Sequence, residues 1–286
     1  MAARLKGFPP KQDLSGLFKA SSIRQLAAGR PTPLLISIAR EYSPELSGGR
    51  LREVLDLAHR SLGQARRSEY FYKNLLIKKL VFGVFSPKTT SVFSEFRVAD
   101  CRADLLLVNS RATVYEIKSE LDDLSKAQKQ AFAYLQCFTE VNFVVDRIHV
   151  DGAKRQLPRE VGICAINDRA QIATLRRATA TEKYLSKRSI FNCLVLSEYQ
   201  ELLGELGGGA PIEYAEAMRL LDPVPPIELQ RYLVRCLRGR AKKSVQDIGW
   251  GSIPPSLLAA AYSYQMSAAQ WRSVIAVLDT PLSEVL

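Results

Sequence analysis

The clearest pattern of apolar and polar positions lies between residues 101 and 119. Two apolar runs, Asp104–Val108 and Ala112–Ile117, are separated by the polar turn Asn109-Ser110-Arg111. Short apolar runs on either side of a polar turn predict a β-hairpin. With a three-residue loop, Val108 would lie opposite Ala112, and the rest of the pairing follows from that register.

In this register Asp104 lies opposite Glu116, and Arg102 lies opposite Lys118. Because side chains alternate along a strand, these four residues share one face at the open end of the hairpin, and the other face is apolar enough to be buried. Opposite residues lie about 5 Å apart at Cβ, so the two carboxylates could share a divalent cation. A two-residue loop would instead place them on opposite faces. A hairpin end whose charges are only solvated is the plainer alternative.

The pattern on either side of the hairpin predicts further elements. Ser68 can cap a helix that ends near Gly83, and residues 91–98 form a strand that leads into the hairpin. A helix through residues 122–138, a buried strand at 140–145 and a second hairpin at 161–175 follow. The order of helix, three-stranded meander, helix, strand and peripheral hairpin predicts an α/β fold over residues 65–178.

Both flanks of this domain have helical patterns. Residues 1–64 predict a basic helical extension that is interrupted at Pro31-Thr32-Pro33. Residues 179–286 predict a helical C-terminal domain with breaks at 207–209, 223–226 and 253–255. The chain is therefore expected to have three segments: 1–64, 65–178 and 179–286.

Composition narrows the class of protein. The chain has 286 residues, of which 47% are hydrophobic and 24% charged, as in a globular protein. No run of 18 apolar residues is present, so no membrane span is expected. The five cysteines are scattered without CxxC spacing, and there are only two histidines, which argues against a disulfide framework, a zinc site or a histidine cluster. We expect a cytoplasmic protein with reduced thiols.

The net charge of +11 makes nucleic acid the first partner to consider. Arg231, Arg235 and Arg238 recur at the spacing of one helical face, and Lys242 and Lys243 extend the charge. Such a face can follow phosphates with little sequence preference. A merely solvated face is the alternative. The helical flanks could also carry a protein partner or a homo-oligomer contact.

Candidate chemistry gathers around the hairpin. Asp104 and Glu116 supply the oxygen ligands that Mg²⁺ prefers, and Lys118 lies on the same strand face as Glu116. Gln130 and Tyr134 are one turn apart on the following helix, so they share a face that could look toward the hairpin. The alternative is that Tyr134 is a core residue and Gln130 is exposed.

Several of these residues match the sequence motifs of a known family. Asp104 followed by Glu116-Ile117-Lys118 resembles the signature of the PD-(D/E)XK nuclease superfamily, and Gln130 to Tyr134 resembles the QxxxY element of its RecB-like branch. The stretches SEYFYKNLLIKKL, FRVADCRADLLLVN and VYEIKSELDDL are similar to an uncharacterised bacterial family of such nucleases. The resemblance covers residues 66–146. It departs at the signature proline, because Ala103 precedes the aspartate.

The resemblance implies a restriction-endonuclease-like core and a metal site. Asp104 and Glu116 would be metal ligands, with the Ile117 carbonyl as a third and Glu69 as a supplementary acidic ligand. Lys118 would be the catalytic lysine, and Gln130 and Tyr134 would support it. Arg102 would contact phosphate or only balance Asp104.

The expected function is a nuclease that depends on Mg²⁺, with Mn²⁺ as a substitute. It would hydrolyse phosphodiester bonds in nucleic acid, with DNA favoured over RNA, in repair, recombination or defence against phage and mobile elements. The alternatives are a catalytically inactive module that binds nucleic acid or serves assembly, and a protein-interaction scaffold.

Overall fold

The structure is a computed structural model that describes residues 14–42, 46, 48–63, 67–167, 169–208, 213–240 and 246–285. The chain divides into two compact units. Unit 1 comprises Met1–Lys88, Ser119–Leu121 and Lys242–Leu286, and unit 2 comprises Thr89–Lys118 and Asp122–Ala241. These boundaries do not coincide with the three segments expected from the sequence. Contacts between distant segments join the two ends of the chain in unit 1 and join residues 179–241 to the sheet in unit 2.

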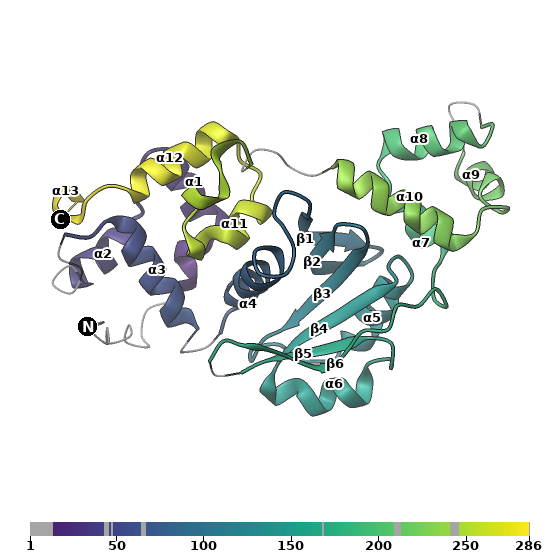
Figure 1. Ribbon diagram of the computed structural model, residues 1–286, viewed down its shortest axis with the longest axis horizontal. Helices are drawn as coiled ribbons and strands as arrows, with labels where there is room; N and C mark the ends of the chain where they lie inside the picture. Colours follow the sequence, from purple (N-terminus) through teal and green to yellow (C-terminus); the bar gives the residue numbers. More distant parts are fainter. Residues whose placement is uncertain are drawn as a thin grey trace. The chain divides into compact units, whose positions relative to one another are not determined.

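Unit 1 is helical in its described residues (Figure 1). Its first part contains η1 (Leu14–Phe18), α1 (Ala20–Ala27), α2 (Pro33–Tyr42), α3 (Leu51–Leu62), α4 (Glu69–Leu76) and the π-helical turn η2 (Ile77–Val81). Its last part contains η4 (Gln246–Ile248), η5 (Trp250–Ser252), η6 (Pro255–Leu257), α11 (Leu258–Ser263), α12 (Ala268–Leu278) and α13 (Leu282–Val285). The helices predicted around Pro31-Thr32-Pro33 are confirmed, and the break separates α1 from α2.

Local sequence accounts for the start of α4. The Ser68 hydroxyl accepts a hydrogen bond from the Phe71 backbone N–H at 3.4 Å, which is the predicted N-cap. Farther along, α4 ends in η2 after Leu76, and the chain turns at Gly83, where a Cβ atom would come within 2.5 Å of the Lys79 carbonyl oxygen. Glycine is therefore required at this close approach.

The core of unit 1 contains a partly buried histidine. His59 on α3 packs among the rings of Phe18, Tyr70 and Phe71. Burial, and then the nearby charge of Lys78, lower the pKa of His59 to about 4. The imidazole is therefore neutral in the folded unit near neutral pH.

Unit 2 is built on a six-stranded mixed sheet in the order β1-β2-β3-β4-β5-β6 (Figure 1). The strands are β1 (Ser91–Val98), β2 (Cys101–Val108), β3 (Ala112–Lys118), β4 (Glu140–Asp146), β5 (Gly162–Ile166) and β6 (Ile172–Arg176). The first three pair antiparallel, β3-β4 and β4-β5 pair parallel, and β5-β6 is the second predicted hairpin. The chain is therefore a mixed α/β protein.

In the described part of unit 2, some helices connect strands of the sheet and the others come after β6. They are α5 (Ala127–Leu135), η3 (Arg147–His149), α6 (Val150–Gln156), α7 (Lys187–Phe191), α8 (Leu196–Glu205), α9 (Tyr214–Leu220) and α10 (Pro226–Gly239). α5 and α6 pack against the sheet and against each other, and α10 contacts both α7 and β2. The sequence did not predict α6.

The hairpin has the predicted three-residue loop and register. Val108 pairs with Ala112 and Leu106 pairs with Val114. The sequence left open whether the charges at the end of the hairpin away from the loop are only solvated. Leu106 and Val114 share a core with Ala131 and Tyr134 of α5. At the charged end Glu116 and Lys118 are buried, Asp104 is half-buried and Arg102 is exposed. No described helix is long and apolar enough to cross a membrane.

Candidate active site

Asp104 is fixed to the neighbouring strand by its own side chain. The described β2-β3 pairing ends at Leu105 and Tyr115. One residue farther along β2, the Asp104 Oδ2 atom accepts a hydrogen bond from the Ile117 backbone N–H at 2.6 Å. A hydrogen bond to an ionised acceptor is stronger than a neutral one, so it holds the carboxylate at this edge of the pairing. The role of the Ile117 carbonyl as a metal ligand stays a prediction.

Glu116 is the most enclosed acidic residue of the site. It is 2% exposed and lies on β3. Its Oε1 atom accepts from the Lys118 Nζ at 3.1 Å and from the Gln130 amide, and its Oε2 atom accepts from the Tyr134 hydroxyl at 2.8 Å. Burial raises the pKa of Glu116, although Lys118 and the hydrogen bonds act in the opposite direction. Its charged form is thus desolvated but surrounded by donors.

Lys118 is buried beside this carboxylate. It is 8% exposed, and its ammonium group is paired with Glu116 across two residues of the same strand. A buried ammonium costs free energy unless it has a charged partner, so the two side chains depend on each other. The structure therefore brings together the predicted lysine and one of the two predicted hairpin carboxylates.

α5 presents Gln130 and Tyr134 to the hairpin. The Tyr134 hydroxyl lies 2.8 Å from both the Glu116 Oε2 and the Arg102 backbone carbonyl oxygen. Burial, followed by the Glu116 charge, raises the pKa of Tyr134 far above its ordinary value, so the hydroxyl stays protonated as a donor. The Gln130 Oε1 atom is buried and has no hydrogen-bond partner among the described residues. The predicted face of α5 does look toward the hairpin.

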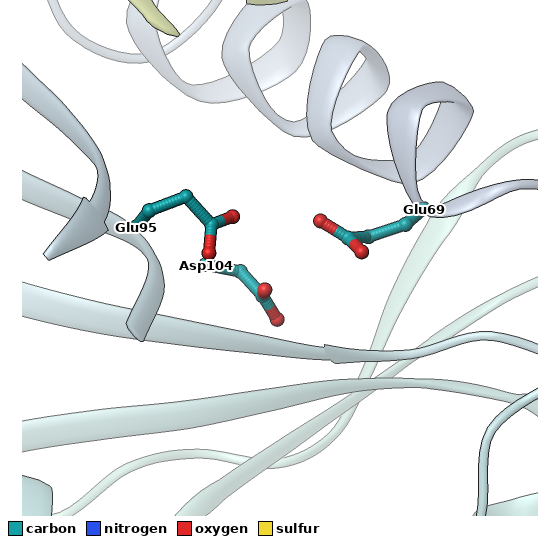
Figure 2. A group of neighbouring side chains, drawn as sticks. All are labelled: Glu69, Glu95 and Asp104. Atoms are coloured by element: carbon teal, nitrogen blue, oxygen red, sulfur yellow. The ribbon is translucent and has the colours of Figure 1, made fainter. Parts of the chain in front are cut away.

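Glu95 is a site residue that the sequence did not identify. It lies on β1, and its carboxylate lies within 4.8 Å of the Asp104 carboxylate. Figure 2 shows these two side chains approaching each other from β1 and β2, and it also draws Glu69 on α4. Glu95 has a φ of 55° and interrupts the β1-β2 pairing between Ser94 and Phe96. A positive φ at a non-glycine residue is uncommon in a strand and leaves no signal in the sequence.

The two remaining residues of the predicted site are Glu69 and Arg102. Glu69 is in the first turn of α4 in unit 1, where it is paired with Lys73 at 2.7 Å. This pair has the helical spacing visible in the sequence, and a supplementary metal-binding role for Glu69 stays a prediction. Arg102 is exposed on β2 and pairs with Arg97 of β1 in the sheet register, which places two arginines side by side.

The predicted basic face is present on α10. Arg231, Arg235 and Arg238 are all exposed, whereas Leu233 and Leu237 on the same helix are buried. Arg231 is paired with Glu228, and Arg235 lies over the Tyr232 ring.

The predicted continuation of this face beyond α10 is only partly described. Lys242 and Lys243 lie outside the described residues. Arg240, the basic residue between α10 and these lysines, is paired with Glu198 at 2.6 Å and donates to the Cys193 carbonyl oxygen at 3.0 Å. It therefore ties α10 to the preceding helices.

The fold and the site define a mixed α/β protein with a buried glutamate–lysine pair on β3 and two neighbouring carboxylates on β1 and β2. A family model described as bacteriophage P4 protein cII matches residues 63–252, which is more than half of the chain. The chain therefore belongs to the bacteriophage P4 protein cII family. Comparisons with curated proteins and with solved structures give no significant match.

Proposed function

We propose that the protein is a metal-dependent nuclease with a restriction-endonuclease-like core. The observation that carries the proposal is the set of donors around Glu116. A buried lysine, a glutamine and a tyrosine converge on one carboxylate at the end of β3. This set is the one that the resemblance to PD-(D/E)XK nucleases with a QxxxY element implies.

The residues fit a hard divalent cation such as Mg²⁺. Oxygen ligands are required, and the Glu95 and Asp104 carboxylates approach within 4.8 Å of each other. The buried Gln130 Oε1, without a partner among the described residues, is a further oxygen acceptor in the same region. Glu95 and Asp104 would hold the ion, and Glu116 is the further ligand that the resemblance implies. When bound, the ion would lower the pKa of a coordinated water and offset charge on a phosphate.

The chain's own residues would then serve phosphodiester hydrolysis. Water attacks phosphorus, the bond from phosphorus to the 3′ oxygen breaks, and that oxygen takes a proton to leave a 5′-phosphate and a 3′-hydroxyl. The Lys118 ammonium would orient the attacking water or stabilise the charge that develops on the phosphate oxygens. Tyr134 and Gln130 would act as positioning residues because both donate to Glu116.

Asp104→Asn is the sharpest test of this function. An asparagine can still accept the hydrogen bond from Ile117, so the fold should be retained while the charge is lost. Asp100→Asn is the matched control, since Asp100 is an exposed carboxylate in the neighbouring turn, paired with Lys129. The substrates are single-stranded, duplex and branched DNA, and RNA, each with Mg²⁺ or Mn²⁺. We expect the parent and the Asp100→Asn control to cleave at least one of them. Cleavage should be lost in Asp104→Asn, in Lys118→Ala and when EDTA is added.

Two outcomes would contradict the mechanism. Cleavage that survives Asp104→Asn, Lys118→Ala or EDTA would exclude this site as the source of activity. Binding that weakens with salt, without cleavage of any substrate, would favour the second candidate function, an inactive nucleic-acid-binding module. The exposed arginines of α10 are the observation that supports this second candidate.

A further inference from the structure

Unit 1 contains an open cavity of about 600 Å³, here called the Trp250 pocket. It is lined by Phe82, Pro87 and Lys88 from the segment after η2, and by Gly249, Trp250 and Gly251 at η5. A volume of this size is typical of small-molecule sites in proteins, which range from about 300 to 1,000 Å³. The pocket shares no residue with the candidate active site.

The aromatic rings of the pocket support one another. Trp250 stacks on Tyr262 of α11, with ring centroids 4.5 Å apart and an interplanar angle of 21°. Phe82 stands against Trp250 in an edge-to-face arrangement, with centroids 5.4 Å apart and an angle of 78°. Tyr262 therefore covers one face of the indole. Trp250 remains partly exposed, so a planar group that stacks on it must approach from the side away from Tyr262.

The two glycines keep the surroundings of the indole open. A Cβ atom at Gly249 or Gly251 would meet no other atom within 4 Å. Gly249 also has a φ of +79°, a conformation that side chains other than glycine rarely adopt. The Gly-Trp-Gly sequence thus presents a large ring between two positions that carry no side chain.

The charge at the pocket favours a particular ligand. Lys88 is exposed at its rim, and the whole chain carries a net charge of +11. An aromatic surface beside a cation matches an unpaired nucleotide, whose base can stack and whose phosphate can meet the ammonium. A purely aliphatic ligand would make no use of the cation.

We propose that the Trp250 pocket binds an unpaired base of single-stranded DNA, with Lys88 at an adjacent phosphate. The inference rests on the proposed function in one respect, that nucleic acid is the ligand. It requires no catalysis, so it can be measured in EDTA. Absence of cleavage in the Asp104 test would leave it standing, and failure of base binding would leave that cleavage test unaffected.

Tryptophan fluorescence gives a direct assay. The chain has two tryptophans, and Trp271 is fully buried, so quenching by a stacked base would report on Trp250. We expect oligothymidylate to quench the full-length protein in EDTA and an abasic oligonucleotide to quench it much less. Trp250→Leu should weaken oligonucleotide binding, measured by anisotropy, about 5- to 150-fold, the range for loss of one stacked base. Tyr214→Leu, which removes an exposed aromatic ring of unit 2, should bind as the parent does.

A second variant keeps the test valid if Trp250→Leu unfolds. Gly251→Val adds a side chain where a Cβ has open space, so the fold should be retained while the pocket is partly filled. It should weaken binding of oligothymidylate and leave binding of the abasic strand nearly unchanged. Equal affinity in Trp250→Leu or Gly251→Val and the parent would overturn the proposal. So would equal quenching by the abasic strand, or quenching by a proline-rich peptide and not by oligothymidylate, since aromatic grooves also accept such peptides.

Discussion

Removal of the Tyr134 hydroxyl tests the donor set around Glu116 in the most direct way. Tyr134→Phe keeps the ring, which is fully buried in the core against the sheet. It removes one O–H group, which lies 2.8 Å from the Glu116 Oε2 and 2.8 Å from the Arg102 carbonyl oxygen. The packing is unchanged, so the effect isolates the hydrogen bond.

The expected cost follows from the charge of the acceptor. A hydrogen bond to an ionised group contributes about 1.5–3 kcal/mol, and a neutral one about 0.5–1.5 kcal/mol. Burial raises the pKa of Glu116, and loss of a donor to its charged form should raise that pKa further. The destabilisation should therefore be about 2 kcal/mol at a pH above the raised pKa of the variant. It should fall toward the neutral value as the pH drops below the pKa of Glu116 in the parent.

Hydrogen exchange measured by mass spectrometry can localise this effect. Amides of β3 should exchange faster in the variant, by an amount that corresponds to the lost free energy of opening. Both tryptophans, Trp250 and Trp271, belong to unit 1. The midpoint of urea unfolding followed by tryptophan fluorescence therefore serves as an internal control, and it should be the same in the variant and the parent. Tyr184→Phe is the matched variant, because its hydroxyl lies at 3.3 Å from the Glu160 carboxylate in a less buried place.

Three results would contradict this expectation. Protection of β3 that is equal in Tyr134→Phe and the parent would mean that the hydroxyl contributes no net stability. A cost that does not change with pH would mean that the ionised form of Glu116 is not the acceptor. A cost in Tyr184→Phe as large as that in Tyr134→Phe would remove the distinction between the buried and the surface bond.

Two further predictions concern other parts of the molecule. Because the folded pKa of His59 is about 4, its neutral form supports unit 1 above pH 6.5, and up to about 3 kcal/mol is lost as the pH falls toward 4. His59→Phe should flatten this acid dependence of the tryptophan transition, and an unchanged dependence would assign it to other groups. Reversal of Arg231, Arg235 and Arg238 to glutamate should weaken duplex DNA binding and reduce the slope of log affinity against log salt by up to about 3. Arg240→Gln should lower stability and leave that slope unchanged, because Arg240 is already paired within the protein. An unchanged slope in the triple variant would assign the face to solvent or a protein partner.

Much of unit 2 could be predicted from local patterns. The alternation of apolar residues determined the hairpin, and the length of its turn determined the register that pairs Val108 with Ala112. The four-residue spacing of Gln130 and Tyr134 placed both on one side of α5, and both donate to Glu116. These features depend on the period of a strand or a helix, and that period is visible in a single sequence.

Other features depend on which distant segments pack together. The approach of the Glu95 carboxylate to Asp104 depends on the pairing of β1 with β2, in which Ser94 lies opposite Leu105 and Phe96 opposite Ala103. Arg240 continues a basic run in the sequence, yet its pairing with Glu198 makes it structural.

The hairpin shows most clearly what the sequence determined about this protein and what the tertiary structure determined. By itself the sequence determined that Glu116 and Lys118 share a strand face and that Tyr134 could look toward them, because side-chain direction follows from local backbone geometry. Only the tertiary structure decided that this face is buried, because burial depends on the packing of α5 against the sheet. The same packing took the ionised groups out of water, and this loss of solvation raises the pKa of Glu116 and makes its three donors necessary.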